Sequence, residues 1–454
     1  MVKTNNLTEG NILKALFRLA IPIMGTSFVQ MAYNMTDMFW VGRIGSRAVA
    51  AVGTAGFFTW LGNAFILIPK IGAEVGVAQS VGKKDMDEAK VYIKHSIQMI
   101  VCLALFYAFT LITFRKPLIR FFNLGEADII NNAIIYLVII SCGLVFYFIN
   151  PVLTAIFNGY GESKTPFIIN TTGLVINMVL DPLLILGIGP FPRLEVAGAA
   201  LATIIAQFVV TVIFVIKAKK RSDLFSGLNL FKAPDIAHLK RIIKLGLPVA
   251  LQSGLFTIFA MFIARIIAQW GPIPIAVQKV GSQIEAVSWM TAGGFQTAMS
   301  AFVGQNYGAK KWPRVFRGYF TGMTIMSIIG IFTSCLLFFA AKPLFSTFIQ
   351  EEETIIYGIA YLKILAFSQL FMCIEATTAG AFNGLGKTIP PSIVGILFNG
   401  LRIPAALILS STSLGLNGVW WAISMSSVFK GIVLSTWYMI MLKRNPETKE
   451  LRES

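Results

Sequence analysis

The residues of this sequence with the most evident chemistry are two aspartates, Asp37 and Asp181, each inside a long apolar stretch. An ionised carboxylate is costly in hydrocarbon, so an acid at membrane depth indicates a functional site unless a structural partner accounts for it. Asn177 precedes Asp181 by one helical turn and lies on the same face, and Pro182 follows the acid directly. The competing interpretation is an acid held in a structural hydrogen-bond network, but the second acid favours function.

The two aspartates together suggest proton chemistry. Two carboxylates in a cavity of low dielectric do not both ionise easily, so Asp37 and Asp181 should take up and release a proton as a pair. Protonation removes a charge and adds a donor, which changes the hydrogen bonds of the first and fifth spans and can favour a bend at Pro22. We therefore expect Asp37, Asp181 and Asn177 to form a proton-coupling or cation-coupling site.

Other polar side chains lie in the same half of the chain, on spans that can face this site. A single Thr or Gln in a span more often forms a helix–helix hydrogen bond, but together these residues predict a polar, substrate-binding cluster. The cluster comprises Gln30, Tyr33 and Asn34 on the first span, Asn150, Thr154 and Asn158 on the fourth, and Thr203 and Gln207 on the sixth.

The C-terminal half has its own charged residues at membrane depth, Glu285, Glu375 and Arg402. A guanidinium at that depth needs a partner, and we expect Glu285 or Glu375 to supply it. A structural ion pair is one interpretation of these residues, and a second cation site is the other. They are our second choice for the functional site.

The elements that hold these residues must be membrane helices. Of the 454 residues, 56% are hydrophobic and only 13% are charged, and the mean hydropathy is +0.73, which indicates an all-α polytopic membrane protein. The net charge of +17 comes from basic residues between apolar runs, so it reflects membrane topology and not nucleic-acid binding. The four cysteines lie in apolar runs without metal-ligand spacing, so we expect no metal site and no cofactor.

Runs long enough to cross a bilayer predict twelve transmembrane helices. Both termini then share one side, and the positive-inside bias places them in the cytoplasm, because few basic residues lie in the opposite loops: Arg43, Arg47, Arg115, Lys116, Arg120, Arg193 and Lys342. The expected helices span residues 13–38, 48–80, 90–114, 130–158, 166–188, 195–218, 240–268, 274–306, 315–340, 355–383, 390–413 and 417–442.

An internal repeat divides the chain into two halves of six helices. Residues 157–161 (Phe-Asn-Gly-Tyr-Gly) match residues 382–386 (Phe-Asn-Gly-Leu-Gly), an offset of about 225 residues that indicates a parallel repeat. We expect an N-terminal lobe, 1–222, and a C-terminal lobe, 223–454, that includes the cytoplasmic linker. At this offset Asp181 falls on Ala406, so the acids break the repeat, and this asymmetry favours a functional role for them.

These features resemble the multidrug and toxic compound extrusion family over essentially the whole chain. The resemblance rests on the helix from Pro22 to Asp37, the segment 157–166, the Asn177/Asp181-Pro182 motif and the segment 198–203. The two aspartates are most similar to the DinF-like and archaeal branch. The resemblance implies two pseudo-symmetric six-helix bundles that form a V-shaped chamber with alternating access.

The resemblance also implies a site and a function. Asp37, Asp181, Asn177, Gln30, Tyr33 and Thr203 match the branch's proton and substrate site by position, and either Thr154 or Asn158 matches a further polar residue. The implied function is a secondary antiporter in the inner (plasma) membrane that exports cationic or amphipathic organic compounds, such as drugs, in exchange for H⁺ or Na⁺, and we expect a monomer. Sodium-coupled members have an acid on the seventh span, where this chain offers Ile263 and Arg265, so H⁺ is favoured.

Two other functions compete with this one. A flippase or exporter of a lipid-linked or other amphiphilic metabolite would resemble sister families, which usually have fourteen spans and a chamber rich in Arg and Lys. A membrane-embedded enzyme lacks support, since His95 and His238 lie in cytoplasmic loops and no nucleophile–base pair is evident. We therefore expect no enzymatic activity.

Overall fold

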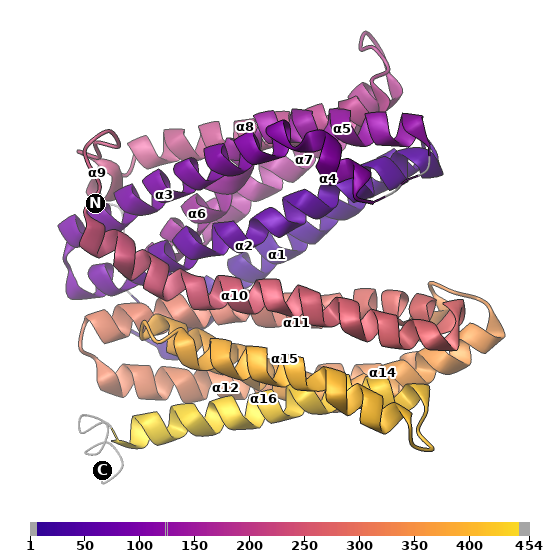
Figure 1. The fold of residues 1–454 in the computed structure, drawn as a ribbon. Coiled ribbons are helices and arrows are strands. Elements are labelled where there is room, and N and C mark those ends of the chain that lie inside the picture. Colours follow the sequence, from indigo (N-terminus) through magenta and orange to yellow (C-terminus); the bar gives the residue numbers. More distant parts are fainter. Residues whose placement is uncertain (1–6, 123, 125, 445–454) are drawn as a thin grey trace. The chain divides into compact units, whose positions relative to one another are not determined.

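The computed structural model describes residues 7–122, 124 and 126–444, and every regular element in those ranges is a helix. Each of the twelve predicted spans corresponds to a helix or a helix pair, which confirms the predicted fold class (Figure 1). The spans are α1 (Ile12–Gly42), α2 (Ser46–Lys83), α3 (Met86–Thr113), α5 with α6 (Ala127–Cys142, Leu144–Tyr160), α7 (Lys164–Leu186), α8 (Glu195–Lys219), α10 (Ile236–Ile267), α11 (Pro272–Gly308), α12 (Trp312–Phe339), α14 (Glu352–Gly384), α15 (Ile389–Ser410) and α16 (Leu416–Arg444).

Short helices connect some of these spans: α4 (Arg115–Arg120), α9 (Ser222–Phe225), the 3₁₀ turn η1 (Ala268–Trp270) and α13 (Ala341–Ser346). Within the described residues, ten helices are by themselves long and apolar enough to cross a membrane, and α5 with α6 forms one further span that is bent by 52°. The 37-residue α11 is long enough to cross but too polar to meet the same criterion. Its polarity has a local cause, because Gln278, Gln283 and Glu285 on α11 line a cavity.

The helices pack into two units. One unit comprises residues 25–247, and the other comprises residues 1–24 together with 248–454. The boundaries fall inside α1, after Met24, and inside α10, after Leu247, so each of these helices contributes to both units. The packing units are therefore cut at different places from the two consecutive lobes expected from the sequence.

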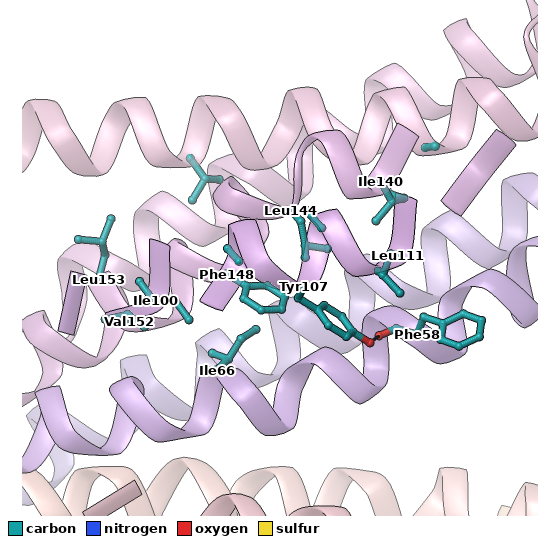
Figure 2. Packing of buried hydrophobic residues seen from close by; sticks show 14 of the residues in the cluster. Phe58, Ile66, Ile100, Tyr107, Leu111, Ile140, Leu144, Phe148, Val152 and Leu153 are labelled. Atoms are coloured by element: carbon teal, nitrogen blue, oxygen red, sulfur yellow. Dashed lines mark hydrogen bonds between the residues drawn. The ribbon is translucent and has the colours of Figure 1, made fainter. Parts of the chain in front are cut away.

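The core of the unit 25–247 is formed by apolar side chains of α2, α3, α5 and α6. Figure 2 shows Ile66, Leu144 and Phe148 in this cluster, all buried. The buried Tyr107 on α3 donates its hydroxyl hydrogen to the backbone carbonyl of Phe58 on α2 over 2.7 Å. A buried tyrosine needs such a partner, and here it also joins α2 to α3.

Glycines allow close backbone contact between helices in each unit, as two examples show. A Cβ atom on Gly198 of α8 would lie 2.3 Å from the carbonyl oxygen of Leu184 on α7, and one on Gly380 of α14 would lie 2.3 Å from that of Gln296 on α11. Only glycine fits at such distances, and small residues let membrane helices pack through dispersion forces. The consequence is that α7 lies against α8, and α11 against α14, and these helices carry both Asp181 and Glu285.

The linker between α9 and α10, residues 226–235, is held against α3. The Gln98 side-chain amide donates to the carbonyls of Leu230 and Lys232 at 2.7 and 3.0 Å, and the Lys94 ammonium donates to that of Ala233 at 3.3 Å. The linker therefore has a defined path, because its backbone carbonyls are satisfied by one face of a helix.

A corresponding contact holds the start of the described chain in the other unit. Arg314 on α12 donates to the backbone carbonyls of Leu7, Glu9 and Gly10 over 3.0, 3.1 and 2.7 Å. Asn306 on α11 donates to the same Leu7 carbonyl over 3.2 Å. In both units, then, the segment that leads into a helix shared by the two units is bound to other helices of its own unit, α11 and α12 in one and α3 in the other.

The two histidines of the chain meet at the linker. The Asp235 backbone N–H donates to Nε2 of His95 over 2.8 Å, while Nδ1 of His95 lies 2.6 Å from the Val91 carbonyl. A carbonyl only accepts, so these contacts assign the proton to Nδ1 and require a neutral ring. His238 stacks on His95 with ring centroids 5.8 Å apart and bonds the Asp235 carboxylate, and that bond lowers the pKa of Asp235 below its ordinary value.

Acidification should loosen the linker. Protonation of His95 removes the acceptor for the Asp235 N–H. A histidine released from such contacts has a pKa of about 6.5, so acid below that value favours the released, protonated state, whereas Asp235 stays ionised because its pKa is lowered. We expect amide exchange in residues 230–235, corrected for intrinsic exchange chemistry, to accelerate by about fivefold between about pH 7.5 and 5.5, since one hydrogen bond contributes on the order of 1 kcal/mol. Hydrogen–deuterium exchange with mass spectrometry measures this.

The matched control for that measurement is His95→Gln. A glutamine oxygen accepts a hydrogen bond at either pH, so the corrected exchange of the linker should become independent of pH in this variant. An unchanged pH response in His95→Gln would contradict the assignment.

Candidate functional site

Asp181 lies in the interior of the unit 25–247. Its side chain and that of Asn177 are fully buried on α7, and the Asn177 amide donates to Oδ1 of Asp181 over 3.0 Å. Oδ2 of Asp181 and Oδ1 of Asn177 have no hydrogen-bond partner among the described residues. A buried carboxylate with an unsatisfied oxygen is costly as an anion, and a proton on that oxygen removes much of the cost.

Asp37 belongs to the same site. It lies on α1, close enough to Asp181 for the two carboxyls to act on each other electrostatically, and its Oδ1 is also buried without a hydrogen-bond partner among the described residues. One turn earlier on α1, the buried Tyr33 donates to the backbone carbonyl of Thr203 on α8 over 3.4 Å. Three helices thus bring the two predicted acids, Asn177, Tyr33 and Thr203 together.

Tyr136 on α5 is a member of this site that the sequence did not reveal. Its hydroxyl is buried, and Asp37, Tyr33 and Asp181 all act on it electrostatically. A lone tyrosine in an apolar helix has no distinctive sequence pattern, so only the packing of α5 could identify it.

The polar residues of α6 and α8 form a hydrogen-bonded group. The Asn150 amide donates to the backbone carbonyl of Gln207 at 3.0 Å and to its side-chain oxygen at 2.8 Å. Thr211, which the sequence analysis did not select, donates to Oδ1 of Asn150 over 2.8 Å. Polar side chains that satisfy each other's hydrogen bonds in this way are typical of a structural contact between helices.

The remaining predicted residues of this half have different surroundings. Thr154 on α6 accepts a hydrogen bond from the Asn170 amide of α7 over 3.3 Å, whereas Asn158 is buried and its Oδ1 has no partner among the described residues. Gln30 and Asn34 are exposed on α1 and make no hydrogen bond with any residue that the structure describes. The structure therefore does not bring Gln30 or Asn34 into contact with the carboxylates.

The other unit contains a large cavity of about 810 Å³ between α10, α11, α14, α15 and α16. This volume lies within the range of sites that enclose drug-sized molecules. Polar, charged and aromatic side chains line it, and all three second-choice residues, Glu285, Glu375 and Arg402, are among them.

Glu285 is held by two neutral donors from α14. The Tyr361 hydroxyl donates to Oε2 over 3.0 Å, and the Gln369 amide donates to Oε1 over 2.9 Å. Tyr361 and Gln369 are both buried, with 2% and 1% of their surface exposed. Both oxygens of this half-buried carboxyl therefore have a partner, and neither partner carries a charge.

The predicted ion pair of Arg402 with Glu285 or Glu375 was wrong. Arg402 donates instead to the hydroxyls of Ser426 and Ser427 on α16, and Glu375 pairs with Lys430, also on α16, over 3.0 Å. The physical reason is that α16 lies against both α15 and α14, so its serines contact Arg402 of α15 and its lysine contacts Glu375 of α14. A lysine in the middle of the last apolar segment, Lys430, was the sequence signal for this pair, and no role was predicted for it.

Comparison with known proteins gives a consistent family. The MatE family model matches residues 22–183 and 248–408, most of the chain. The probable multidrug resistance protein NorM of Thermotoga maritima is 27% identical over 423 residues, which cover 92% of this chain and 90% of that protein.

Two solved structures agree in fold. An outward-facing multidrug resistance MATE family transporter of the MOP superfamily superposes with a TM-score of 0.88 at 25% identity, covering 97% of this chain and 98% of that one. A MATE crystal structure in the bent conformation superposes with a TM-score of 0.91 at 23% identity over 100% of both chains.

The Glu375–Lys430 pair generates a stability prediction. Both side chains are mostly buried, with 16% and 10% exposed, so Lys430→Met should leave an uncompensated carboxylate and destabilise the protein by about 3 kcal/mol. Adding Glu375→Gln removes that charge, and the double variant should regain most of the loss. Thermal unfolding of the purified protein in detergent measures the stability of both single variants and of the double variant. A loss of stability in the double variant equal to the sum of the two single losses would contradict the pairing.

Proposed function

The chain belongs to the MatE family, and from this premise we propose that it is a secondary active antiporter that exports amphipathic or cationic organic compounds in exchange for protons. The family is one of membrane transporters and not of enzymes. Its relative in Thermotoga maritima carries the name of a probable multidrug resistance protein, which supports organic compounds as the cargo.

The observation that carries the proton coupling is the unsatisfied pair of carboxyls in the unit 25–247. Asp37 and Asp181 act on each other electrostatically, and each has one buried oxygen without a hydrogen-bond partner in the described part of the chain. Such a pair has the lowest cost when one of its carboxyls is protonated, because one proton removes both the repulsion and an unsatisfied acceptor.

Loss of the proton has a defined local consequence. The Asn177 amide already occupies Oδ1 of Asp181, so the charge left by deprotonation falls on a site with one neutral donor and a second carboxylate beside it. A cationic group of a substrate, or water admitted with it, then stabilises the deprotonated pair. Proton and substrate thus compete for the same carboxyls, and this competition is the basis of antiport.

Helix α1 offers a route from this site to a change of conformation. It carries Asp37 in the unit 25–247, and after Met24 its N-terminal part belongs to the other unit. Pro22 lies within α1, where it removes one backbone hydrogen bond. A change in the hydrogen bonds at Asp37 and Tyr33 therefore acts on a helix that has a weak point next to the boundary between the units.

The choice of H⁺ over Na⁺ as the coupling ion rests on the carboxyl pair of the unit 25–247 and on the lack of an acid at one position of the other unit. Sodium-coupled relatives of this kind have an acid on the seventh span, where this chain has the buried Ile263 and the exposed Arg265.

Moving one elementary charge through about 100 mV yields about 2.3 kcal/mol, so two protons would support a substrate gradient of about three orders of magnitude.

The location follows from the same proposal. A family of multi-pass membrane proteins and the excess of basic residues at the ends of α2, α8, α11 and α16 support the inner (plasma) membrane, with both termini in the cytoplasm. A monomer contains both units, and we propose the monomer as the working form.

Replacing either acid should uncouple transport. We expect Asp37→Asn and Asp181→Asn each to abolish export against a gradient, since neither amide can cycle a proton, and the double variant to be no worse than either single one. The measurement is substrate uptake or counterflow in proteoliposomes, with a pH gradient and a Na⁺ gradient imposed one at a time. Asp128→Asn, the same change at an exposed aspartate in the first turn of α5, outside the carboxyl site, is the matched control and should keep coupled transport.

Two outcomes would overturn the proposal. Export by Asp37→Asn against a gradient at the parent rate would remove the N-terminal carboxyls from the coupling step. Transport by the parent protein that responds to the Na⁺ gradient and not to the pH gradient would replace the coupling ion.

A further inference from the structure

Arg402 is a cavity-lining cation without an acidic partner. Its guanidinium donates to the hydroxyls of Ser426 and Ser427, and it forms no ion pair within the described residues. Glu285 and Glu375 act on it electrostatically, but neither lies within ion-pair distance of it. The serines orient the guanidinium and leave its charge uncompensated, which is unusual for a cation at membrane depth.

The acids of the cavity are already occupied. Glu375 pairs with Lys430 at 3.0 Å, and Glu285 accepts hydrogen bonds from Tyr361 and Gln369. The cavity also has the exposed Lys279 on its wall. Three cations and two acids therefore line this space, and of the two cations without an acidic partner Arg402 is half-buried whereas Lys279 is exposed.

The surroundings of Arg402 suit the apolar body of an organic ligand. The guanidinium carbon lies 5.9 Å from the ring centroid of Phe256 on α10. Phe259 and Trp289 line the same cavity, whose volume of about 810 Å³ accommodates a drug-sized molecule. Flat apolar side chains beside a fixed cation provide both contact area and an anchor.

We propose that this cavity binds aromatic carboxylates and related amphipathic organic anions, with the anionic group on Arg402. A guanidinium presents its N–H groups in a planar fork that matches a carboxylate, and two serines keep only part of the fork occupied. The aromatic body of the ligand then lies against Phe256. This inference rests on the proposed export function and adds to it a second class of substrate, organic anions, whose site lies in a different unit from the proton site.

The charge on Arg402 is well suited to this role because its neighbours do not neutralise it. Lys430, one turn from Ser426 and Ser427 on the same helix, is neutralised by Glu375, and so it cannot bind an added anion without losing that partner. Glu285 and Glu375 help to keep Arg402 charged from a distance. An incoming carboxylate at Arg402 replaces water and breaks no ion pair, which makes Arg402 the place of lowest cost for an anion.

Equilibrium binding to the purified full-length protein in detergent tests this. The probes are fluorescein as an aromatic carboxylate and ethidium as an aromatic cation, each followed by fluorescence anisotropy. Arg402→Gln should weaken fluorescein binding by at least about tenfold, and Arg402→Lys by less, because lysine keeps the charge and loses the fork. Ethidium binding should be unchanged or tighter in both variants.

The matched control is Arg265→Gln. Arg265 lies on α10 in the same unit, is exposed, and does not line the cavity, so its loss removes one positive charge without touching the proposed site. It should leave both affinities at the parent value. Equal weakening of fluorescein binding by Arg265→Gln and Arg402→Gln would overturn the inference, because it would indicate a general effect of net charge.

A competition experiment on the parent protein covers the case in which Arg402→Gln fails to fold. 2-Naphthoate should displace bound fluorescein, whereas 2-naphthylmethylammonium, of the same shape and opposite charge, should not. Absence of fluorescein binding, or equal displacement by both compounds, would overturn the inference. Because binding is measured without a gradient, failure here leaves the proton-coupling test unaffected, and failure of coupling leaves this test intact.

Discussion

The cost of an unpaired polar group in hydrocarbon is the constraint on which the interior of this protein depends. Each helix must satisfy its own backbone, so polar side chains are free to serve other purposes only where protein or a cavity covers them. In the unit 25–247, this cost explains why Asp37, Asp181 and Asn177 lie together at the buried faces of α1 and α7. In the other unit it places charged side chains around one cavity.

The same constraint produces two different solutions in two related halves. In one unit, acids without cations leave oxygens unsatisfied, an arrangement that suits a mobile proton. In the other, Glu375 is neutralised by Lys430 and Arg402 is left with neutral partners, an arrangement that suits a bound anion. A repeat that keeps its helices but changes the sign of its interior charge gives one chain two polar sites that favour ligands of opposite charge.

The connection between the halves lies in two helices. Packing divides α1 after Met24 and α10 after Leu247, and each of these helices begins beside a segment bound to the ends of neighbouring helices, through Arg314 in one unit and through Gln98 and His95 in the other. A change in the hydrogen bonds of Asp37 thus acts on a helix whose start is held in place. We therefore expect α1 to bend in the part around Pro22.

The sequence by itself determined the helices and the nature of the acid site, because hydropathy, the repeat and buried charge are properties of single segments and of their spacing. It could place Asp37, Asp181 and Asn177 at membrane depth for that reason, and their role stays a prediction. Only the tertiary structure decided which charges meet: Arg402 faces serines because α15 packs on α16, and Glu375 pairs with Lys430 because α14 packs on α16. Such pairings depend on which helix faces lie against each other, and helical periodicity within one segment contains no information about the neighbouring helix.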